Sequence, residues 1–156
     1  MNQMKILLVG GAGFIGAHMI KHLEDFDYEV EVLDNLSSGF KENVNNLKLH
    51  IIDLKDKRIL LDFFKENQFD VVMHFASYIN VGESYLKPQK YFENNVNNTK
   101  NLLDCMVETK VLKIIFSSSA AIYGDPQSSL ISEDHPINPV NPYGMSKAIV
   151  EKMLSQ

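Results

Sequence analysis

Four glycines between residues 10 and 16 have the spacing of a phosphate-binding turn. The apolar run Lys5–Val9 leads directly into Gly10, Gly11, Gly13 and Gly16, which fit both G-x-G-x-x-G and G-x-x-G-x-x-G. One glycine lets the chain turn tightly off a strand, a second lets bare backbone approach a pyrophosphate, and a third lets a helix pack closely on the sheet. The N-terminus of that helix offers unpaired N–H groups to an anion. The glycines alone also fit an ordinary strand–turn–helix, so the prediction of a dinucleotide site needs a second feature.

An aspartate at the end of the next apolar run supplies that feature. The run Tyr28–Leu33 ends at Asp34, at the distance from the glycines where an acid can accept hydrogen bonds from the adenosine ribose hydroxyls. Its charge would repel a 2′-phosphate, and no arginine stands nearby, so the sequence favours NAD over NADP. Asp-Asn followed by Ser-Ser-Gly is also good turn chemistry, which leaves a turn-capping role for Asp34 open.

A second group of residues could perform acid–base chemistry. Tyr143 and Lys147 are four residues apart, on one face of a helix predicted over Pro142–Ser155. An ammonium beside a phenol favours the phenolate, which can then act as a general base, and the lysine can also donate to cofactor ribose hydroxyls. The serines 117–119 follow a predicted strand at the edge where open α/β sheets place ligands. A surface Tyr–Lys pair and simple capping by the serines are the alternatives.

Strands and helices alternate along the chain to position these groups. The predicted strands are Lys5–Val9, Val30–Leu33, Leu47–Ile52, Asp70–His74 and Val111–Phe116. The predicted helices are Phe14–Glu24, a short one near Lys41–Asn46, Lys55–Asn67, Pro88–Glu108 and Pro142–Ser155. Strands that alternate with crossover helices form a parallel, doubly wound sheet. The long irregular stretch Ser117–Asn141 is of a length that usually indicates function.

The composition is that of a globular protein with one domain. The chain has 156 residues, 45% of them hydrophobic and 22% charged, which is enough for one core. A net charge of −5 without a basic stripe argues against a nucleic-acid partner. No apolar run has the length of a membrane span, so we expect a cytoplasmic protein without a membrane partner. The single cysteine, Cys105, has no internal disulfide partner, and the five histidines have no metal-ligand spacing, so no metal is predicted.

Several motifs together resemble a known family. They are GGAGFIG at 10–16, Asp34-Asn35-Leu36, Asp53-Leu54, His74-Phe75-Ala76, Asn94-Asn95-Val96, the run 117–124 and Tyr143-x-x-x-Lys147. In this order and spacing they resemble the extended short-chain dehydrogenase/reductases over essentially the whole chain. Within that group the match is closest to the UDP-glucose 4-epimerases, because Val81-Gly82-Glu83-Ser84 and the run Tyr91–Asn97 are epimerase-like. The resemblance implies an α/β, Rossmann-like doubly wound parallel sheet and NAD as the cofactor.

The resemblance also implies a role for each matching residue. The pyrophosphate would be held by Gly10, Gly11, Gly13, Phe14, Ile15 and Gly16. Asp34 and Asn35 would hold the adenosine ribose, and Asp53 and Leu54 would flank the adenine. The nicotinamide side would be lined by Phe75, Ala76 and Asn95. The catalytic residues would be Tyr143 as base, Lys147 as its partner and Ser119 as the substrate-binding serine.

The reaction implied is the interconversion of UDP-glucose and UDP-galactose through a 4-keto sugar. Dehydratases of the superfamily carry an Asp-Glu pair after the active-site hydroxyl, whereas this chain has Ala120-Ala121. Two alternatives stay open. One is another nucleotide-sugar epimerase or decarboxylase of the superfamily, and the other is an NAD-binding module without turnover.

The chain also departs from the resemblance. Ile79 stands where epimerases commonly have a lysine, which bears on the affinity for the cofactor. Family members are considerably longer, so residues 1–156 are expected to form an incomplete NAD-binding domain without the C-terminal sugar-nucleotide region. The expected partners are a UDP-sugar substrate and either a second copy, as a homodimer, or a complementing C-terminal half.

Overall fold

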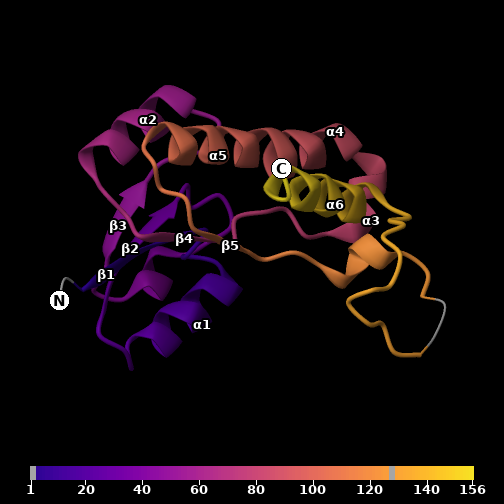
Figure 1. The fold of residues 1–156 in the computed structure, drawn as a ribbon, viewed down its shortest axis with the longest axis horizontal. Helices are drawn as coiled ribbons and strands as arrows, with labels where there is room; N and C mark the ends of the chain where they lie inside the picture. Colours follow the sequence, from indigo (N-terminus) through magenta and orange to yellow (C-terminus); the bar gives the residue numbers. More distant parts are fainter. Residues whose placement is uncertain (1–2, 127–128) are drawn as a thin grey trace. The chain divides into compact units, whose positions relative to one another are not determined.

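The computed structural model describes residues 3–126 and 129–156, which form two compact units (Figure 1). The first unit comprises the chain up to Ala76 together with Lys100–Ser117. The second comprises Ser77–Thr99 and the chain from Ser118 onward. All the strands of the described residues belong to the first unit. Whether residues 1–156 act as one domain stays a prediction, and residues 1, 2, 127 and 128 within that range lie outside the description.

Five parallel strands form the sheet of the first unit. They are β1 (Met4–Val9), β2 (Tyr28–Asp34), β3 (Lys48–Ile51), β4 (Val71–His74) and β5 (Ile114–Phe116). Their order is β3-β2-β1-β4-β5, and each neighbouring pair is parallel. The strands are joined through α1 (Phe14–Leu23), the 3₁₀ turn η1 (Lys41–Val44), α2 (Lys57–Glu66) and α5 (Asn98–Glu108). The order reverses direction between β1 and β4, which confirms the predicted Rossmann-like, doubly wound sheet.

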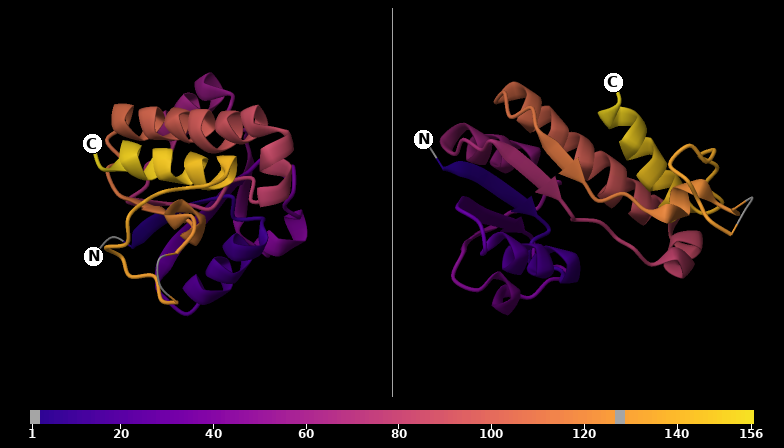
Figure 2. Two further views of the ribbon diagram at one scale, coloured as in Figure 1. Left: turned by 90° about the vertical axis from the view of Figure 1, so that its right-hand side faces the viewer. Right: turned by 60° about the horizontal axis from the view of Figure 1, so that its bottom comes forward.

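The alternation of side chains along β1 explains why helices cover both faces of this sheet. Ile6 and Leu8 pack on one face with residues of α1, whereas Leu7 and Val9 pack on the other with residues of α2 and α5. The ribbon views show α1 on one side of the sheet and α2 with α5 on the other (Figures 1 and 2). All four side chains are at most 2% exposed, so β1 is the centre of the core.

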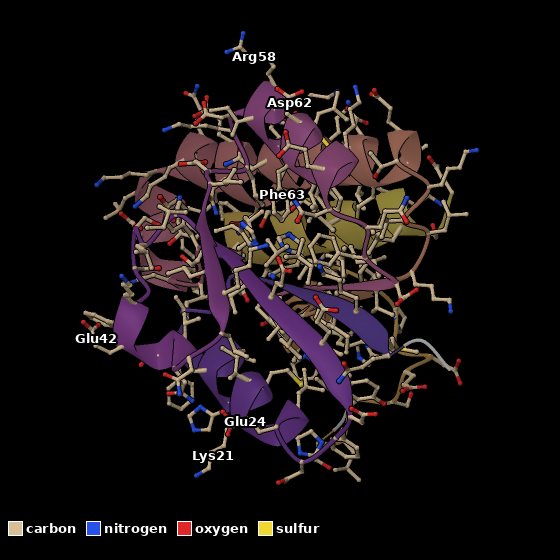
Figure 3. All side chains as sticks on the ribbon, turned by 90° about the vertical axis from the view of Figure 1, so that its left-hand side faces the viewer. Lys21, Glu24, Glu42, Arg58, Asp62 and Phe63 are labelled. Atoms are coloured by element: carbon tan, nitrogen blue, oxygen red, sulfur yellow. The ribbon has the colours of Figure 1, made fainter. Side chains whose placement is uncertain are left out.

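Helix α2 shows how the helical spacing of apolar residues produces this packing. Leu60, Phe63 and Phe64 are buried, while Arg58 and Asp62 are exposed. Figure 3 shows the Phe63 side chain directed toward the sheet and Arg58 directed away from it. Because residues three and four apart share a helix face, the sequence Arg58–Phe64 gives one apolar stripe and one solvated stripe.

The second unit is helical in its described residues. It contains α3 (Val81–Leu86), α4 (Pro88–Tyr91), the π-helical turn η2 (Phe92–Asn97), the 3₁₀ turn η3 (Ala120–Tyr123) and α6 (Pro142–Leu154). Both further views show α6 running alongside the α4–η2 segment (Figure 2). No helix of residues 3–126 and 129–156 combines the length and the apolar character needed to cross a bilayer.

The predicted helix over Pro88–Glu108 is confirmed in its bounds, and the structure adds a π-helical turn inside it. The stretch consists of α4, η2 and α5, which follow one another without a break, and Asn95 within η2 bonds other segments through its side chain. Helix α3 was not predicted at all. Its signal was present in the sequence, since the Asn80 side chain caps the helix by accepting from the Glu83 N–H at 2.9 Å.

Lys110 closes α5 in a conformation that favours glycine. Its φ is 63°, and two hydrogen bonds, Lys110 N–H to Val107 O and Val111 N–H to Met106 O, form a Schellman cap. We expect Lys110→Gly to raise the free energy of unfolding by about 1 kcal/mol, because the left-handed region is strained for a residue with a Cβ. Thermal denaturation would show the gain. Lys113→Gly is the matched control, and it should lower stability because Lys113 has no positive φ.

Candidate functional site

Three of the four glycines are required by the fold itself. Gly10 has a φ of 81°, and a Cβ there would lie 2.7 Å from the Ala76 Cα. A Cβ on Gly16 would lie 2.5 Å from the Gly10 carbonyl oxygen, and one on Gly11 would lie 2.7 Å from Cγ1 of Val32. Gly10 therefore makes the tight turn off β1, while Gly11 and Gly16 permit the close approach of turn, helix and strand.

Gly13 is different, because nothing within the described residues requires a glycine there. It is the N-cap of α1 with φ −78° and ψ 176°, and no side chain caps this helix end. The nearest described atom to a Cβ at Gly13 would be the Gly10 carbonyl oxygen at 3.4 Å. Phe14 and Ile15, which follow it, are 79% and 54% exposed. An uncapped helix start with open space in front of it fits a pyrophosphate.

Asp34 performs the turn-capping role that the sequence left open. Its Oδ2 accepts from the Ala12 N–H at 3.0 Å, and its Oδ1 accepts from the Leu36 N–H at 2.8 Å. The second bond holds Leu36 at a φ of 57°, a conformation that is uncommon for leucine. Each carboxylate oxygen can accept more than one hydrogen bond, so the capping role leaves room for the predicted contact to the ribose, which stays a prediction.

The residues predicted to surround the adenosine lie on the loops after β2 and β3. The Asn35 amide donates to Asp53 Oδ2 at 3.0 Å, and the Lys55 N–H donates to Asp53 Oδ1 at 3.0 Å. Burial opposes the charged form of Asp53, but these hydrogen bonds outweigh it and lower the pKa of the carboxyl. The Leu54 side chain lies in the core, and its carbonyl accepts from Asn101 at 3.0 Å. Asn35 and Asp53 are thus in direct contact, and their assignment to the adenosine stays a prediction.

The end of β4 is tied to the end of β1. The N–H groups of Phe75 and Ala76 both donate to the Val9 carbonyl, at 2.7 and 3.1 Å. This places Phe75 and Ala76 beside Gly10 at the point where the strand order reverses, which is where open α/β sheets bind ligands. Their assignment to the nicotinamide side stays a prediction.

In the second unit, Tyr143 and Lys147 occupy one face of α6. The helix begins with Asn141, whose side chain accepts from the Gly144 N–H at 2.7 Å, and with Pro142 in its first turn. Tyr143 is 8% exposed and Lys147 is 3% exposed, so the pair is not the surface pair of the alternative interpretation. The Tyr143 ring packs edge-on against the buried ring of Tyr91, with centroids 6.5 Å apart.

Ser119 lies in a segment that contacts the first turn of α6. A Cβ on Gly144 would lie 3.0 Å from the Ala121 carbonyl carbon, so the absence of a side chain at Gly144 lets η3 approach the helix. Ser119 itself caps η3, because its Oγ accepts from the Ala121 N–H at 3.2 Å. The capping role is therefore present, and a substrate contact by the same hydroxyl stays a prediction.

Asn95 holds the backbone around Tyr143 rather than standing free. Its carboxamide accepts from the Tyr78 N–H and from Asn94, and it donates to the Tyr78 carbonyl and to Ser146 Oγ, all at 2.8–3.0 Å. Ser146 Oγ in turn donates to the Tyr143 carbonyl at 2.6 Å. These bonds use both hydrogens and both oxygen lone pairs of the amide. Sequence reasoning missed Ser146, although it immediately precedes the lysine of the motif.

Burial sets the protonation behaviour of Lys147. It lowers the pKa of the ammonium from 10.5 to about 8, because a charged group loses hydration when buried. Among the described residues, no group of three or more His, Cys, Asp or Glu side chains could hold a metal ion.

The lowered pKa predicts how stability depends on pH. Below about pH 8 the Lys147 ammonium is charged in both the folded and the unfolded chain. Its burial then lowers the free energy of unfolding by the full equivalent of the pKa shift, about 3 kcal/mol. Between about pH 8 and 10.5 the folded chain has released the proton and the unfolded chain still binds it, so the cost shrinks as pH rises. Lys147→Met should raise the free energy of unfolding by about 2 kcal/mol at neutral pH, and the gain should vanish at high pH.

Urea unfolding of the variant and the wild type across this pH range measures the effect. Lys152→Met is the control, because Lys152 lies exposed on the same helix and should give no such pH-dependent difference. A gain for Lys147→Met that stays constant from neutral to high pH would show that burial does not perturb this lysine.

Comparison with known proteins agrees with this geometry. Over residues 6–156 the chain matches the model of the NAD dependent epimerase/dehydratase family. It is 42% identical over 153 residues to UDP-glucose 4-epimerase of Lactobacillus helveticus, covering 97% of this chain and 46% of that protein. UDP-glucose 4-epimerase of Bacillus subtilis is also 42% identical, and 47% of it is covered. The chain thus spans about half the length of the curated relatives it matches.

A solved structure shows the same correspondence. UDP-glucose 4-epimerase from Brucella ovis in complex with NAD superposes with a TM-score of 0.94 at 42% identity, covering 97% of this chain and 47% of that one. The family match extends over nearly the whole chain and confirms NAD as the cofactor that the glycines and Asp34 predicted. The chain belongs to the NAD dependent epimerase/dehydratase family.

Proposed function

We propose that this chain is the NAD-binding and catalytic part of an epimerase that inverts C4 of a UDP-hexose, interconverting UDP-glucose and UDP-galactose. The observation that carries the proposal is the buried pair Tyr143–Lys147 on a capped helix, in a chain that is 42% identical to UDP-glucose 4-epimerase of Lactobacillus helveticus. A phenol and an ammonium withdrawn from water are suited to move one proton to and from a sugar hydroxyl.

The residues of this chain would divide the work as follows. The Tyr143 phenolate takes the proton of the 4-hydroxyl and returns it at the end of the reaction. The Lys147 ammonium favours the phenolate and donates to the cofactor ribose, and Ser119 Oγ hydrogen-bonds the oxygen on C4. A bound NAD would supply a hydride acceptor and donor for C4 of the sugar, so that hydride could leave one face and return to the other. Ala120 and Ala121 provide no acid or base for loss of water.

Most of the residues that would hold the cofactor belong to the first unit. Gly10, Gly11, Gly13, Gly16 and the N–H groups of Phe14 and Ile15 would bind the pyrophosphate. Asp34 and Asn35 would bind the adenosine ribose, with Asp53 and Leu54 beside the adenine. Phe75 and Ala76 would face the nicotinamide, and Asn95, whose amide is already engaged, would contribute by shaping its surroundings.

We further propose that residues 1–156 act as one NAD-binding domain, whose sugar-nucleotide contacts come from a complementing C-terminal half. The coverage of 46% of the Lactobacillus helveticus enzyme supports this. Alternatively, a second copy of the chain in a homodimer could supply the missing contacts. The coverage also favours an alternative function, in which the chain binds NAD without turning over any sugar.

One experiment separates the two functions. The chain is mixed with NAD⁺ and UDP-galactose, with and without the C-terminal half of the Lactobacillus helveticus enzyme, and UDP-glucose is measured by chromatography. Formation of UDP-glucose in the complemented mixture supports the epimerase. Binding of NAD by calorimetry without any UDP-glucose in either mixture would instead favour the binding module.

A further inference from the structure

The segment after β2 holds the peptide group that precedes Gly13. The Ala12 carbonyl oxygen accepts two hydrogen bonds, from Asn43 Nδ2 at 2.8 Å and from the Phe40 N–H at 3.1 Å. The Ala12 N–H donates to Asp34 Oδ2 at 3.0 Å. Both lone pairs of this carbonyl are therefore used by one short segment. We call Asp34, Phe40 and Asn43 the Ala12 clamp.

Asn43 is well placed to act as the side-chain part of the Ala12 clamp. A carbonyl oxygen only accepts, so the nitrogen of the Asn43 amide and not its oxygen must face Ala12. Asn43 belongs to η1, which is anchored by the buried side chain of Val44. The approach also requires Gly39, because a Cβ there would lie 2.8 Å from the Ala12 carbonyl carbon.

Holding this carbonyl fixes the start of α1. The peptide group is planar and trans, so the direction of the Ala12 carbonyl also sets the direction of the Gly13 N–H. A glycine-rich loop that is free to move must be ordered when a ligand binds, at a cost in affinity, whereas a loop that is already held avoids this cost. The three hydrogen bonds of the Ala12 clamp hold the loop in the free protein, together with those from the Gly10 N–H to the Leu33 carbonyl at 2.8 Å and from the Gly13 N–H to the Gly10 carbonyl at 3.3 Å.

We propose that Asn43 is a positioning residue for the phosphate-binding loop, whose amide holds the Ala12 carbonyl and so prepares the first turn of α1 for the NAD pyrophosphate. This inference rests on the cofactor-binding part of the proposed function. It needs neither the sugar nor the C-terminal half, because the ligand contact concerned is that between NAD and residues 10–16.

The test compares NAD⁺ with adenosine, which has no phosphate. By titration calorimetry, Asn43→Ala should weaken NAD⁺ binding about fivefold, the equivalent of one hydrogen bond, and should leave adenosine binding, followed by NMR, unchanged. Asn43→Asp, which keeps the shape but turns an acceptor toward the carbonyl, should weaken NAD⁺ binding further. Asn43→Asp also keeps the test valid if Asn43→Ala unfolds η1.

The control is Asn67→Ala. Asn67 makes the same kind of bond, from its amide to the Phe63 carbonyl at 2.9 Å, and it lies outside the Ala12 clamp. It should lower stability as much as Asn43→Ala without changing NAD⁺ affinity. Equal NAD⁺ affinities in Asn43→Ala, Asn43→Asp and the wild type would overturn the proposal.

A second readout separates this inference from the proposed function. Amide hydrogen exchange of Gly13 in the free chain should be faster in Asn43→Ala than in the wild type and unchanged in Asn67→Ala. A wild type that binds no NAD⁺ would overturn the proposed function and with it the role toward the pyrophosphate. Unchanged Gly13 exchange in a chain that binds NAD⁺ would overturn only the role of Asn43.

Discussion

Gly13→Val is expected to abolish NAD binding and to leave the fold intact. Valine readily adopts the extended backbone of Gly13, with φ −78° and ψ 176°, and a Cβ there would have no described neighbour closer than 3.4 Å. The branched side chain would instead fill the space through which a pyrophosphate approaches the backbone. Calorimetry should show a loss of at least about 100-fold in NAD affinity, or about 3 kcal/mol. The melting temperature of the free chain should change by less than about 2 °C.

Two further glycines provide the controls for this result. Gly16→Val should unfold the first unit, because its Cβ would lie 2.5 Å from the Gly10 carbonyl oxygen. Gly82→Ala should leave the affinity unchanged and raise stability by up to about 1 kcal/mol, since Gly82 lies in α3 and its Cβ would lie 3.5 Å from the nearest described atom, Asn80 Oδ1. If Gly13→Val kept the affinity of the wild type, the pyrophosphate would not pass over Gly13, and the assignment of the loop would be wrong.

Tyr143→Phe is expected to keep NAD binding and to remove hydride transfer. The substitution retains the ring that packs edge-on against Tyr91 and removes only the hydroxyl that would accept the proton. A positioned general base contributes about 10²–10⁴-fold to rate, so the formation of UDP-glucose from UDP-galactose should fall by about 10³-fold or more. The measurement uses the complemented mixture described above, with NAD affinity determined on the same samples.

Tyr85→Phe is the matched control for the loss of a phenol. The Tyr85 hydroxyl is on an exposed side chain and donates to the Val140 carbonyl at 2.9 Å, so its removal should leave the rate unchanged. A Tyr143→Phe variant with the rate of the wild type would assign the proton transfer to another group. An equal loss of NAD affinity would mean that the hydroxyl binds the cofactor rather than the substrate proton.

Most of the fold follows from local sequence signals. The central strand β1 is an apolar run that ends at the glycine turn, and the alternation of Ile6 and Leu8 with Leu7 and Val9 requires a helix layer on both faces. Parallel neighbours then follow from the helices in between. Local periodicity gives no signal for the π-helical turn η2, and the bonds that Asn95 within it makes reach Tyr78 and Ser146, 17 and 51 residues away.

The residue types of the candidate site could be predicted from the sequence. The structural role of each glycine and of Asn43 could not. Spacing alone could not choose between the two glycine patterns. In the structure, Gly10 makes the turn after β1, Gly13 borders open space, and Gly16 packs closely against the loop backbone. Asn43 gave no signal in the sequence, because its partner Ala12 is a backbone carbonyl 31 residues away. Every residue type has a backbone carbonyl, so a side chain that binds one does not need a particular residue as its partner. A sequence motif therefore cannot record such a contact.

The double engagement of Asp34 has a consequence for any change of cofactor preference. Accepting NADP would require removal of the negative charge that is predicted to face the ribose, and the simplest route is substitution of Asp34. The same carboxylate holds the N–H groups of Ala12 and Leu36, so that substitution would also loosen the glycine loop. Selectivity and loop shape are thus coupled through one side chain. An engineer, or natural selection, would have to replace the lost support for Ala12 at the same time as adding a cation for the 2′-phosphate.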